Sequence, residues 1–520
     1  MRPRSGSVEE ERKHTIGENR MGLYDALWRA AEGKPEQRAF SGPDLGAEGV
    51  SYGALHARAG RWAAGLQALG VGPGDRVLVQ AEKSVEVVVL YLATLRTGAC
   101  YVPLNTAYTA TEMAYFFTDA APTVAVLPAP EALAAHADGC CCLTLDALAA
   151  QLDEEREALA PVLRSAEDLA AILYTSGTTG RSKGAMLSHG NLLSNAQALR
   201  SLWGWQADDV LVHSLPIYHV HGLFVALHCA MLEPSEVRFL PRFSPEAVLE
   251  ALPGATVFMG VPTHYVRLLD APGLTVEASA AMRLWVSGSA PLRPETHEAF
   301  EARTGHKILE RYGMSEAGMI TSNPLEGARI PGTVGFVLPE GEVRLRSEEG
   351  APVPEGAVGV LEIRGPNVFS GYWRQPEKTA ESFRDGWFIT GDMAQIDETG
   401  RVSIVGRHKD LVISGGLNVY PREVESVLDT LPGIEESAVF GVPHRDFGEA
   451  VVAAVVLKVD AYPGENATLA ALREALAAFK VPKALFPVAA LPRNTMGKVQ
   501  KNQLRADYAL TFRETSGATP

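Results

Sequence analysis

The chain has 520 residues and a formal net charge of −15; 46% of its residues are hydrophobic and 21% are charged. A single hydrophobic core stops growing at about 250–300 residues, so this length predicts at least two domains. The acidic balance argues against a nucleic-acid-binding protein, because such a protein needs a basic face to offset phosphates. Any site for an anionic substrate must therefore be made cationic locally.

The longest apolar stretch, the N-terminal residues and the cysteines argue against further classes of protein. The longest apolar stretch, residues 85–93, is too short to span a bilayer, which takes about 18 residues. Residues 1–21 lack the apolar core of a secretory signal and are expected to form a disordered tail. Cys140, Cys141 and Cys142 are adjacent and cannot share a metal at useful geometry. We expect a cytoplasmic protein without a structural metal.

Apolar runs alternate with helical patterns along the first two thirds of the chain. Residues 75–80 and 123–127 predict buried strands, and residues 85–97 between them have helical spacing, which indicates βαβ units. Further strands are expected at residues 210–215, 256–259 and 283–287, and helices at residues 52–69 and 245–252.

From about residue 356 the pattern changes to short β-like runs at residues 358–364 and 401–406. A compact α+β segment is expected next, with helices at residues 421–430 and 469–479 and a strand at residues 451–459. The sequence thus predicts an α/β fold. A large N-terminal domain of mainly parallel sheets covered by helices, with a β-rich subdomain, is expected at residues 22–406, and a small mobile α+β domain at residues 407–520.

The stretch from Thr175 to Gly184 contains only hydroxyl, glycine and cationic residues, and it follows an apolar strand pattern at residues 169–174. Backbone N–H groups and small hydroxyls can surround a polyphosphate, and Arg181 and Lys183 add positive charge. The stretch is not a Walker loop, because a serine precedes Lys183 and a glycine follows it. A flexible linker is the alternative, but linkers do not usually interrupt a core strand pattern. We predict a phosphate-binding loop.

Other segments place polar residues and glycine in apolar surroundings. His219 and His221 could bind a metal, but no third ligand of suitable spacing accompanies them. Residues 287–291 suit either close approach to a ligand or a plain turn. Residues 310–316 place a tyrosine that could stack on a purine beside a carboxylate that could hold Mg²⁺; a solvated loop is the alternative. Residues 390–392 and 406–407 could bind ribose hydroxyls, and residues 491–501 form a polar loop.

Taken together and in this order, these segments resemble the adenylate-forming superfamily of acyl-CoA synthetases, peptide-synthetase adenylation domains and luciferases. The resemblance covers residues 23–505 and rests on the phosphate loop, YGMSE at 312–316, TGD at 390–392, GRHKD at 406–410 and PRNTMGK at 492–498. It implies that an acid and ATP form an acyl-adenylate and pyrophosphate, and that the acyl group then passes to a thiol. Positioning and electrostatics would supply the catalysis.

The resemblance also implies residue roles. ATP would contact Thr175, Ser176, Gly177, Thr178, Thr179, Gly180, Lys183, Ser289, Ala290, Pro291, Glu310, Arg311, Tyr312, Gly313, Met314 and Ser315. Asp392 and Arg407 would bind the ribose, and Glu316 would hold Mg²⁺. Lys498 would bridge the acyl carboxylate and the α-phosphate and neutralise developing charge.

For the second step, the resemblance implies a hinge at Lys409 and a coenzyme A tunnel along Ser414, Gly415 and Gly416, where a Cβ would block the path. His219 would be the gate between the acyl pocket and the tunnel, which replaces the metal interpretation. With Thr175, Glu316 and Lys498, it completes the expected catalytic set.

Within the superfamily the chain is most similar to malonyl-CoA synthetases, at residues 103–109, 219–221, 260–263, 365–369, 440–444 and 493–502. Malonate would leave a second carboxylate in the acyl pocket, and burying it unpaired would cost about 3–5 kcal/mol. Arg242 matches the family position that offers a cation, although it could be a surface arginine at a strand end; Arg283 is a second candidate. Val220 and Met314 would close the pocket around C2 and limit the size of a branch, and valine in place of a common threonine is expected to shift tolerance toward methylmalonate.

Two alternatives remain open: a ligase of the same chemistry for another short-chain or aromatic acid, and an adenylation module that loads a carrier protein. A luciferase-like oxygenase would use the same adenylation site. We expect a monomer or homodimer with no nucleic-acid or membrane partner, and a lysine acetyltransferase and deacetylase that act on Lys498.

Overall fold

The computed structural model describes residues 22–136, 139–153, 156–175, 182–407, 410–414, 417–444, 447–458, 461–476, 478–494 and 497–512. The predicted tail lies outside them. The chain forms two compact units: unit 1 is Met1–Glu342 with Ile363–Phe388, and unit 2 is Val343–Glu362 with Ile389–Pro520. The predicted α/β class is confirmed, whereas the predicted domain boundary between residues 406 and 407 stays a prediction.

Unit 1 contains a mainly parallel seven-stranded sheet. Its strand order is β18 (Gly371–Tyr372), β8 (Lys183–Ser188), β7 (Leu169–Thr175), β4 (Cys100–Pro103), β3 (Arg76–Val79), β5 (Val124–Val126) and β6 (Cys141–Leu143). The β7–β8 and β8–β18 pairs are antiparallel. The apolar runs predicted at residues 75–80 and 123–127 form β3 and β5, which pair in parallel.

A second sheet of unit 1 has nine strands. Their order is β15 (Phe336–Val337), β14 (Gly318–Ser322), β13 (Leu309–Met314), β12 (Leu284–Ser287), β11 (Val257–Gly260), β9 (Val210–His213), β10 (Glu236–Phe239), β1 (Arg38–Ser41) and β2 (Val50–Ser51). From β13 to β1 every neighbouring pair is parallel. The carboxyl ends of these strands therefore share one edge of the sheet, and ligands of open parallel sheets bind outside such an edge.

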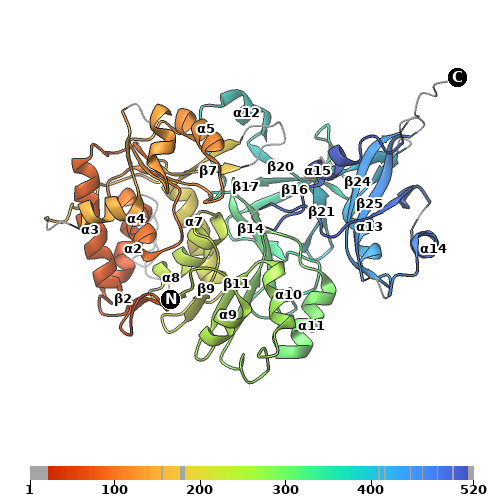
Figure 1. Cartoon of the computed structure of the whole chain (residues 1–520), viewed down its shortest axis with the longest axis horizontal. Coiled ribbons are helices and arrows are strands. Elements are labelled where there is room, and N and C mark those ends of the chain that lie inside the picture. The colour runs from red at the N-terminus through yellow and green to blue at the C-terminus, as the bar shows by residue number, and fades with distance from the viewer. Residues whose placement is uncertain are drawn as a thin grey trace, which may run out of the picture. The chain divides into compact units, whose positions relative to one another are not determined.

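Helices cover the sheets of unit 1 (Figure 1). They are α2 (Leu23–Glu32), α3 (Tyr52–Ala68), α4 (Val85–Arg96), α5 (Ala110–Ala120), α6 (Leu145–Leu152), α7 (His189–Leu202), α8 (His228–Leu232), α9 (Pro245–Ala251), α10 (Pro262–Asp270), α11 (Pro294–Thr304) and α12 (Pro376–Glu381), with a 3₁₀ turn η1 (Pro130–His136) and a π-helix η2 (His221–Leu227). None of the described helices is long and apolar enough to cross a bilayer.

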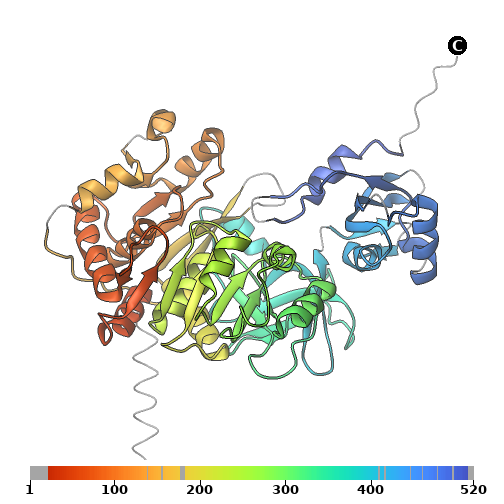
Figure 2. The same ribbon diagram turned by 60° about the horizontal axis from the view of Figure 1, so that its bottom comes forward.

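The core beneath the nine-stranded sheet is aromatic. Tyr265 of α10 and Trp285 of β12 pack on Phe300 of α11, with ring centroids 5.3 and 4.9 Å from that of Phe300. Figure 2 shows the green helices α9, α10 and α11 lying over the strands of this sheet. Close packing of large rings fixes the positions of the strand ends.

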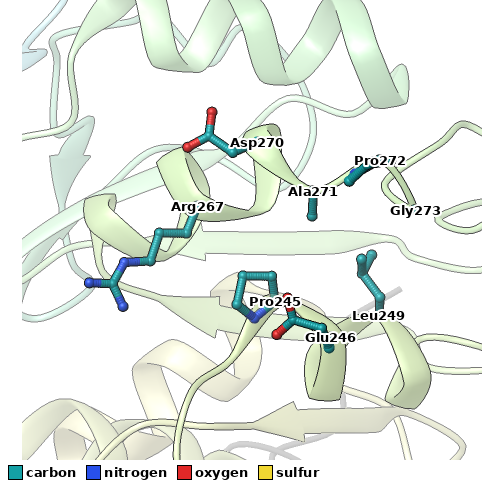
Figure 3. Close-up of a pocket in the computed structure, with 8 residues that line it drawn as sticks. All are labelled: Pro245, Glu246, Leu249, Arg267, Asp270, Ala271, Pro272 and Gly273. Atoms are coloured by element: carbon teal, nitrogen blue, oxygen red, sulfur yellow. The ribbon is translucent and has the colours of Figure 1, made fainter.

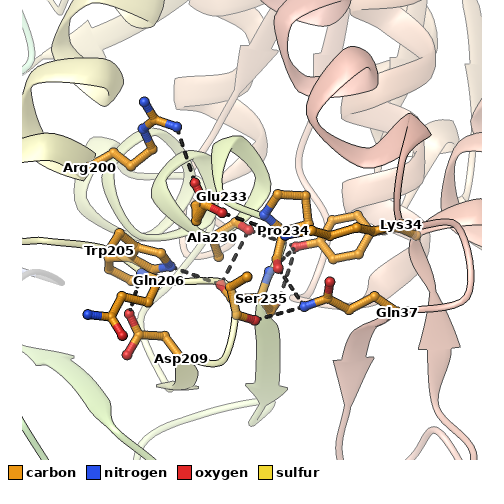
Figure 4. Close-up of polar contacts among 12 residues, drawn as sticks. Lys34, Gln37, Arg200, Trp205, Gln206, Asp209, Ala230, Glu233, Pro234 and Ser235 are labelled. Atoms are coloured by element: carbon orange, nitrogen blue, oxygen red, sulfur yellow. Dashed lines mark hydrogen bonds and ion pairs between the residues drawn. The ribbon is translucent and has the colours of Figure 1, made fainter.

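Polar contacts join the N-terminal helices to the same sheet (Figure 4). The Tyr52 hydroxyl lies 2.7 Å from the carbonyl oxygen of Ala230 and 2.9 Å from that of Ser235. The Trp205 indole donates to Ser235 Oγ at 2.9 Å. These buried groups are satisfied within the protein, which anchors the chain just before β10.

Unit 2 contains two antiparallel-rich sheets. The first includes β16 (Glu342–Arg346), β17 (Gly359–Arg364), β20 (Trp387–Ile396) and β21 (Val402–Arg407), and the second has β23 (Leu417–Val419), β22 (Val412–Ser414), β25 (Gly448–Leu457), β24 (Ile434–His444) and β26 (Leu485–Pro487). Helices α13 (Pro421–Leu428), α14 (Glu465–Ala475) and α15 (Lys501–Asp507) complete it. The helix predicted at residues 469–479 thus lies four residues earlier at each end, because it starts directly after Gly464 and the backbone is already extended at Leu476.

Candidate active site

Four of the predicted site segments follow parallel strands of the nine-stranded sheet. His219 follows β9, Arg242 follows β10, Ser289 follows β12, and Met314 ends β13. The parallel register places all four at the carboxyl edge. This arrangement joins segments that are up to about 100 residues apart in sequence into one candidate acyl and nucleotide site.

The predicted phosphate loop connects the antiparallel strands β7 and β8. Thr175 and Lys183 face each other as Cα partners at the end of this pair, while residues 176–181 lie outside the described residues. The Lys183 ammonium lies 4.8 Å from the ring centroid of Tyr372. The Tyr372 hydroxyl in turn donates to Glu316 Oε1 at 3.0 Å. The base of the loop and Glu316 therefore meet around one tyrosine.

Glu316 lies in a tightly held turn between β13 and β14. Asn195 accepts from the Met319 N–H at 3.0 Å and donates to the Met319 carbonyl at 2.7 Å. The Asn367 amide donates to the Ala317 carbonyl at 2.8 Å. A Cβ at position 313 would come within 2.2 Å of the Gly318 carbonyl oxygen, so only glycine fits there.

Glu316 has the chemistry of a Mg²⁺ ligand. Mg²⁺ in nucleotide sites is held by one or two carboxylates together with substrate phosphates. Glu316 is a buried carboxylate near the base of the phosphate loop, fixed by the tyrosine hydroxyl. This donor suits a magnesium ion that also contacts ATP phosphates.

His219 and His221 lie where β9 leads into η2. Burial and the nearby Arg311 charge lower the pKa of His219 to about 4, so its imidazole is neutral at pH 7. His219 Nδ1 accepts from the His221 N–H at 3.4 Å, which leaves its proton on Nε2. His221 Nδ1 lies 3.3 Å from Ser289 Oγ, and Ser289 has φ +71°. Such strained backbone is common at functional sites.

The predicted adenine residues occupy the neighbouring strand ends. Glu310 is buried, and its Oε1 accepts from the Gly332 N–H at 3.2 Å and lies 3.8 Å from His297 Nδ1. Tyr312 and Ser315 are half-buried, and Ala290 and Pro291 follow β12 with increasing exposure. The carboxylate of Glu310 thus links β13 to the loop at Gly332 and lies close to His297 of α11.

The two arginines considered for the acid differ in position. Arg242 is exposed and lies just beyond β10, at the carboxyl edge. Arg283 precedes β12 and so lies at the opposite edge, where its Nε donates to Asp209 Oδ1 at 2.7 Å and its Nη1 to the Trp203 carbonyl at 3.0 Å. Our prediction of Arg283 as a second cation for the acid is therefore corrected: it is a structural partner of Asp209.

Lys83 is a residue that the sequence did not single out. Its amino group donates to His213 Nδ1 at 2.8 Å, to the His213 carbonyl at 2.8 Å and to the Leu240 carbonyl at 2.7 Å. Burial holds the pKa of Lys83 well below its usual value. A lysine before the helical pattern at residues 85–97 reads as an ordinary surface charge, so only the tertiary contacts reveal it.

In unit 2, Asp392 of β20 and Arg407 of β21 are Cα partners, and their side chains form an ion pair of 2.6 Å between Oδ1 and Nε. Lys498 is exposed in a loop in which its N–H donates to Asn494 Oδ1 at 2.9 Å. Ser414 ends β22. Lys409, Gly415 and Gly416 lie outside the described residues.

A groove on the outer helices of unit 1 is separate from these residues. Figure 3 shows its lining: Pro245, Glu246, Leu249, Arg267, Asp270, Ala271, Pro272 and Gly273. The lining comes from α9, α10 and the loop after α10, and it includes none of the predicted site residues. We do not assign it to the candidate site.

Comparison with known proteins gives a family for this arrangement. Residues 27–373 match the AMP-binding enzyme family, and residues 423–498 match the AMP-binding enzyme C-terminal domain. The ATP-bound MatB from Rhodopseudomonas palustris is 51% identical, with a TM-score of 0.92 over 95% of this chain and 100% of its own.

Curated relatives include ligases for different acids. The mitochondrial malonate–CoA ligase ACSF3 of Mus musculus is 37% identical over 83% of this chain and 81% of its own length. A feruloyl-CoA synthase from Amycolatopsis sp. is 35% identical over 91% of this chain and 98% of its own. The chain therefore belongs to the AMP-binding enzymes of the adenylate-forming superfamily, as an AMP-forming acyl-CoA ligase near the malonyl-CoA synthetases that uses ATP and coenzyme A.

Proposed function

We propose that the protein ligates malonate, and more slowly methylmalonate, to coenzyme A through a malonyl-adenylate. The observation that carries this proposal is the charge of the carboxyl edge. The segments after β9, β10, β11 and β12, at residues 214–222, 240–243, 260–262 and 287–291, contain no Asp or Glu, and one of them carries Arg242. The acidic residue after β13 at this edge, Glu316, is the one that we assign to Mg²⁺. An acyl pocket for a second carboxylate needs a cation and no competing acid. The similarity to malonate–CoA ligase ACSF3 supports the same acid.

In the first half-reaction, the activated carboxylate of malonate attacks the α-phosphorus of ATP, and pyrophosphate leaves. We assign Thr175 and the loop to Lys183 to the ATP phosphates, Ser315 to the α-phosphate, and Asp392 with Arg407 to the ribose. Lys498 would lie between the attacking carboxylate and the α-phosphate and offset the charge that accumulates there. Mg²⁺ bound by Glu316 would neutralise phosphate charge.

In the second half-reaction, the coenzyme A thiol attacks the acyl carbon and AMP leaves. We assign the hinge to Lys409 and the tunnel wall to Ser414, Gly415 and Gly416. His219, neutral near pH 7, would close the acyl pocket until the thiol arrives. A neutral ring at this gate avoids attracting a carboxylate away from the pocket.

A ligase for an aromatic acid is the second candidate, and the 35% identity to the feruloyl-CoA synthase favours it. Ferulate has no second carboxylate and needs an apolar pocket floor. Val220 and Met314 alone would suit either acid, so Arg242 is the residue that separates the two proposals.

The test is pyrophosphate release with malonate, methylmalonate, acetate, succinate, ferulate and octanoate, each with and without coenzyme A. Malonate is expected to give the highest kcat/KM, followed by methylmalonate. A higher kcat/KM for ferulate, acetate or octanoate would overturn the proposal.

A further inference from the structure

Helix α5 contacts the strand ends on both sides of the predicted phosphate loop. The Tyr115 hydroxyl donates to the Ser182 carbonyl at 2.7 Å, just before Lys183 of β8. The Tyr174 hydroxyl, in β7, donates to Asp119 Oδ2 at 2.5 Å. Figure 1 shows α5 beside β7. One helix therefore holds the chain where it enters the loop and where it leaves the loop.

Tyr115 and Asp119 share one face of a helix that is itself fixed to the core. Residues four positions apart lie one above the other on an α-helix. Phe116 is buried, and its ring centroid lies 4.7 Å from that of Tyr174. The Trp373 indole donates to the Asp119 carbonyl at 2.9 Å. These contacts fix α5 against the seven-stranded sheet, so the helix can serve as a support for the loop ends.

Folding stability alone does not require the two side-chain hydrogen bonds. Tyr115 and Asp119 are half-buried, so water could satisfy their polar groups if the bonds were absent. Such a bond contributes little net stability, because the unfolded chain makes equivalent bonds to water. Misplacement of a substrate-binding group by about 1 Å, by contrast, can lower a rate about 100-fold. The effect of these contacts is therefore expected in catalysis more than in stability.

The charge of Asp119 also favours a positioning role. A carboxylate near a polyphosphate site repels the ligand, so its presence there is unfavourable on charge alone. Asp119 instead accepts a charge-assisted hydrogen bond, which is stronger than a neutral one. Burial and this bond raise the pKa of Tyr174, so its hydroxyl stays a donor near neutral pH. The carboxylate thus holds Tyr174, the residue before Thr175, despite the repulsion.

We propose that Tyr115 and Asp119 are positioning residues of the adenylation step, which fix the strand ends that carry the phosphate loop. They act through the Ser182 carbonyl and the Tyr174 hydroxyl rather than by contact with ATP. The inference rests on the proposed function, in which residues 175–183 bind the ATP phosphates. It concerns the first half-reaction alone, because the acyl-adenylate has already lost the β- and γ-phosphates as pyrophosphate.

The test measures kcat/KM for ATP in pyrophosphate release, the Kd of AMP by calorimetry, and thioester formation from preformed acyl-adenylate. The acid is the one that the wild type uses best, so the result does not depend on malonate. Tyr115→Phe, Tyr174→Phe and Asp119→Ala are each expected to lower kcat/KM for ATP about 10- to 100-fold. The Kd of AMP, which lacks the β- and γ-phosphates, and the rate of thioester formation are expected to change by less than about threefold.

Further variants test whether the contacts act as proposed. Asp119→Asn keeps an acceptor and is expected to recover part of the loss in Asp119→Ala. Asp119→Ala combined with Tyr174→Phe is expected to lie within about threefold of the worse single variant, because both changes remove the same hydrogen bond. The control Tyr52→Phe removes a hydroxyl that contacts the Ala230 and Ser235 carbonyls. It is expected to lower Tm and to leave kcat/KM for ATP unchanged.

Three outcomes overturn the inference. One is a lower Tm with unchanged kcat/KM for ATP in Tyr115→Phe and Tyr174→Phe. Another is an equal loss for ATP, AMP and thioester formation. The third is improved use of ATP by Asp119→Ala, which would mean that its carboxylate acts by repulsion alone. If Asp119→Ala does not fold, losses confined to ATP in the two phenylalanine variants still support the inference.

The inference and the proposed function fail in different ways. A wild type that prefers an acid other than malonate overturns the malonate proposal and leaves the role of α5 standing. A wild type that releases no pyrophosphate with any acid overturns both.

Discussion

The amino group of Lys83 lies 2.8 Å from His213 Nδ1 and 2.7 Å from the Leu240 carbonyl oxygen, so one lysine joins the ends of β9 and β10. Burial holds the pKa of His213 well below its usual value, so its ring is neutral and carries one proton. Because the Gly222 carbonyl oxygen can only accept, that proton lies on Nε2, which donates to it at 3.0 Å, and Nδ1 accepts from Lys83. The contact fixes Leu240 two residues before Arg242.

Replacement of Lys83 by Met is therefore expected to change kcat/KM for malonate more than it changes the free energy of unfolding. The variant loses three hydrogen bonds but also the cost of a buried ammonium, and these changes oppose each other. A displaced Arg242 is expected to lower malonate kcat/KM about 10- to 100-fold. The control is Lys34→Met, since Lys34 lies only in a surface pair 3.6 Å from Glu233. Equal malonate kcat/KM in both variants would refute the role of Lys83 in positioning Arg242.

The buried histidines predict a pH dependence of stability. Burial lowers the pKa of His219 to about 4 and that of His264 to about 3, below the ordinary value of 6.5. Between those values the unfolded chain binds protons that the folded protein does not, so the free energy of unfolding falls as pH drops below 6.5. Each such histidine contributes up to about 1.4 kcal/mol per pH unit.

Urea unfolding of wild type and His219→Gln from pH 7.5 to pH 4.5 measures this contribution. The variant is expected to lose stability less steeply than wild type as the pH falls. Identical slopes in wild type and His219→Gln would mean that burial does not lower the pKa of His219 in the folded protein.

Arg242→Ala tests the cation at the end of β10. Loss of one charge from the pocket is expected to lower malonate kcat/KM about 10- to 100-fold, while propionate kcat/KM stays the same or rises. Arg238→Ala is a matched control within β10, because Arg238 donates to the Ala251 and Pro253 carbonyls at 2.6 Å. It should reduce Tm without a change in selectivity. Unchanged malonate kcat/KM in Arg242→Ala would exclude this arginine as the cation that binds the second carboxylate of malonate.

Lys498→Ala should separate the two half-reactions. Adenylation, followed as pyrophosphate release, is expected to fall about 100- to 1000-fold, because one charge-stabilising donor is lost. Thioester formation from preformed malonyl-adenylate should change by less than about threefold. Lys501→Ala is the control, since Lys501 pairs with Glu425 at 2.5 Å. A similar loss in both half-reactions would assign Lys498 a structural role.

Apolar runs made much of the fold predictable. The runs at residues 75–80, 123–127 and 283–287 became β3, β5 and β12 within one or two residues at each end, because buried parallel strands need continuous apolar side chains. β13 was not predicted as a strand. Its sequence, Leu-Glu-Arg-Tyr-Gly-Met, carries polar side chains that we assign to the candidate site. These side chains interrupt the apolar pattern from which a buried strand is predicted.

The order of the motifs along the sequence predicted the candidate site, but it could not predict which groups each side chain contacts. Arg283 and Arg311 are both arginines at or in strands, and only the tertiary structure gives one of them Asp209 and leaves the other unpaired among described residues. The Lys83–His213 contact spans 130 positions and follows from how two sheets of unit 1 meet.

A competition experiment shows whether the enzyme selects a short dicarboxylate over other acids. Equal concentrations of malonate, methylmalonate, propionate, ferulate and octanoate are mixed with ATP, Mg²⁺ and limiting coenzyme A, and the thioesters formed are measured by mass spectrometry. The product ratios give the ratios of kcat/KM. Malonyl-CoA is expected to dominate, with methylmalonyl-CoA second; a majority of propionyl-, feruloyl- or octanoyl-CoA would contradict the claim.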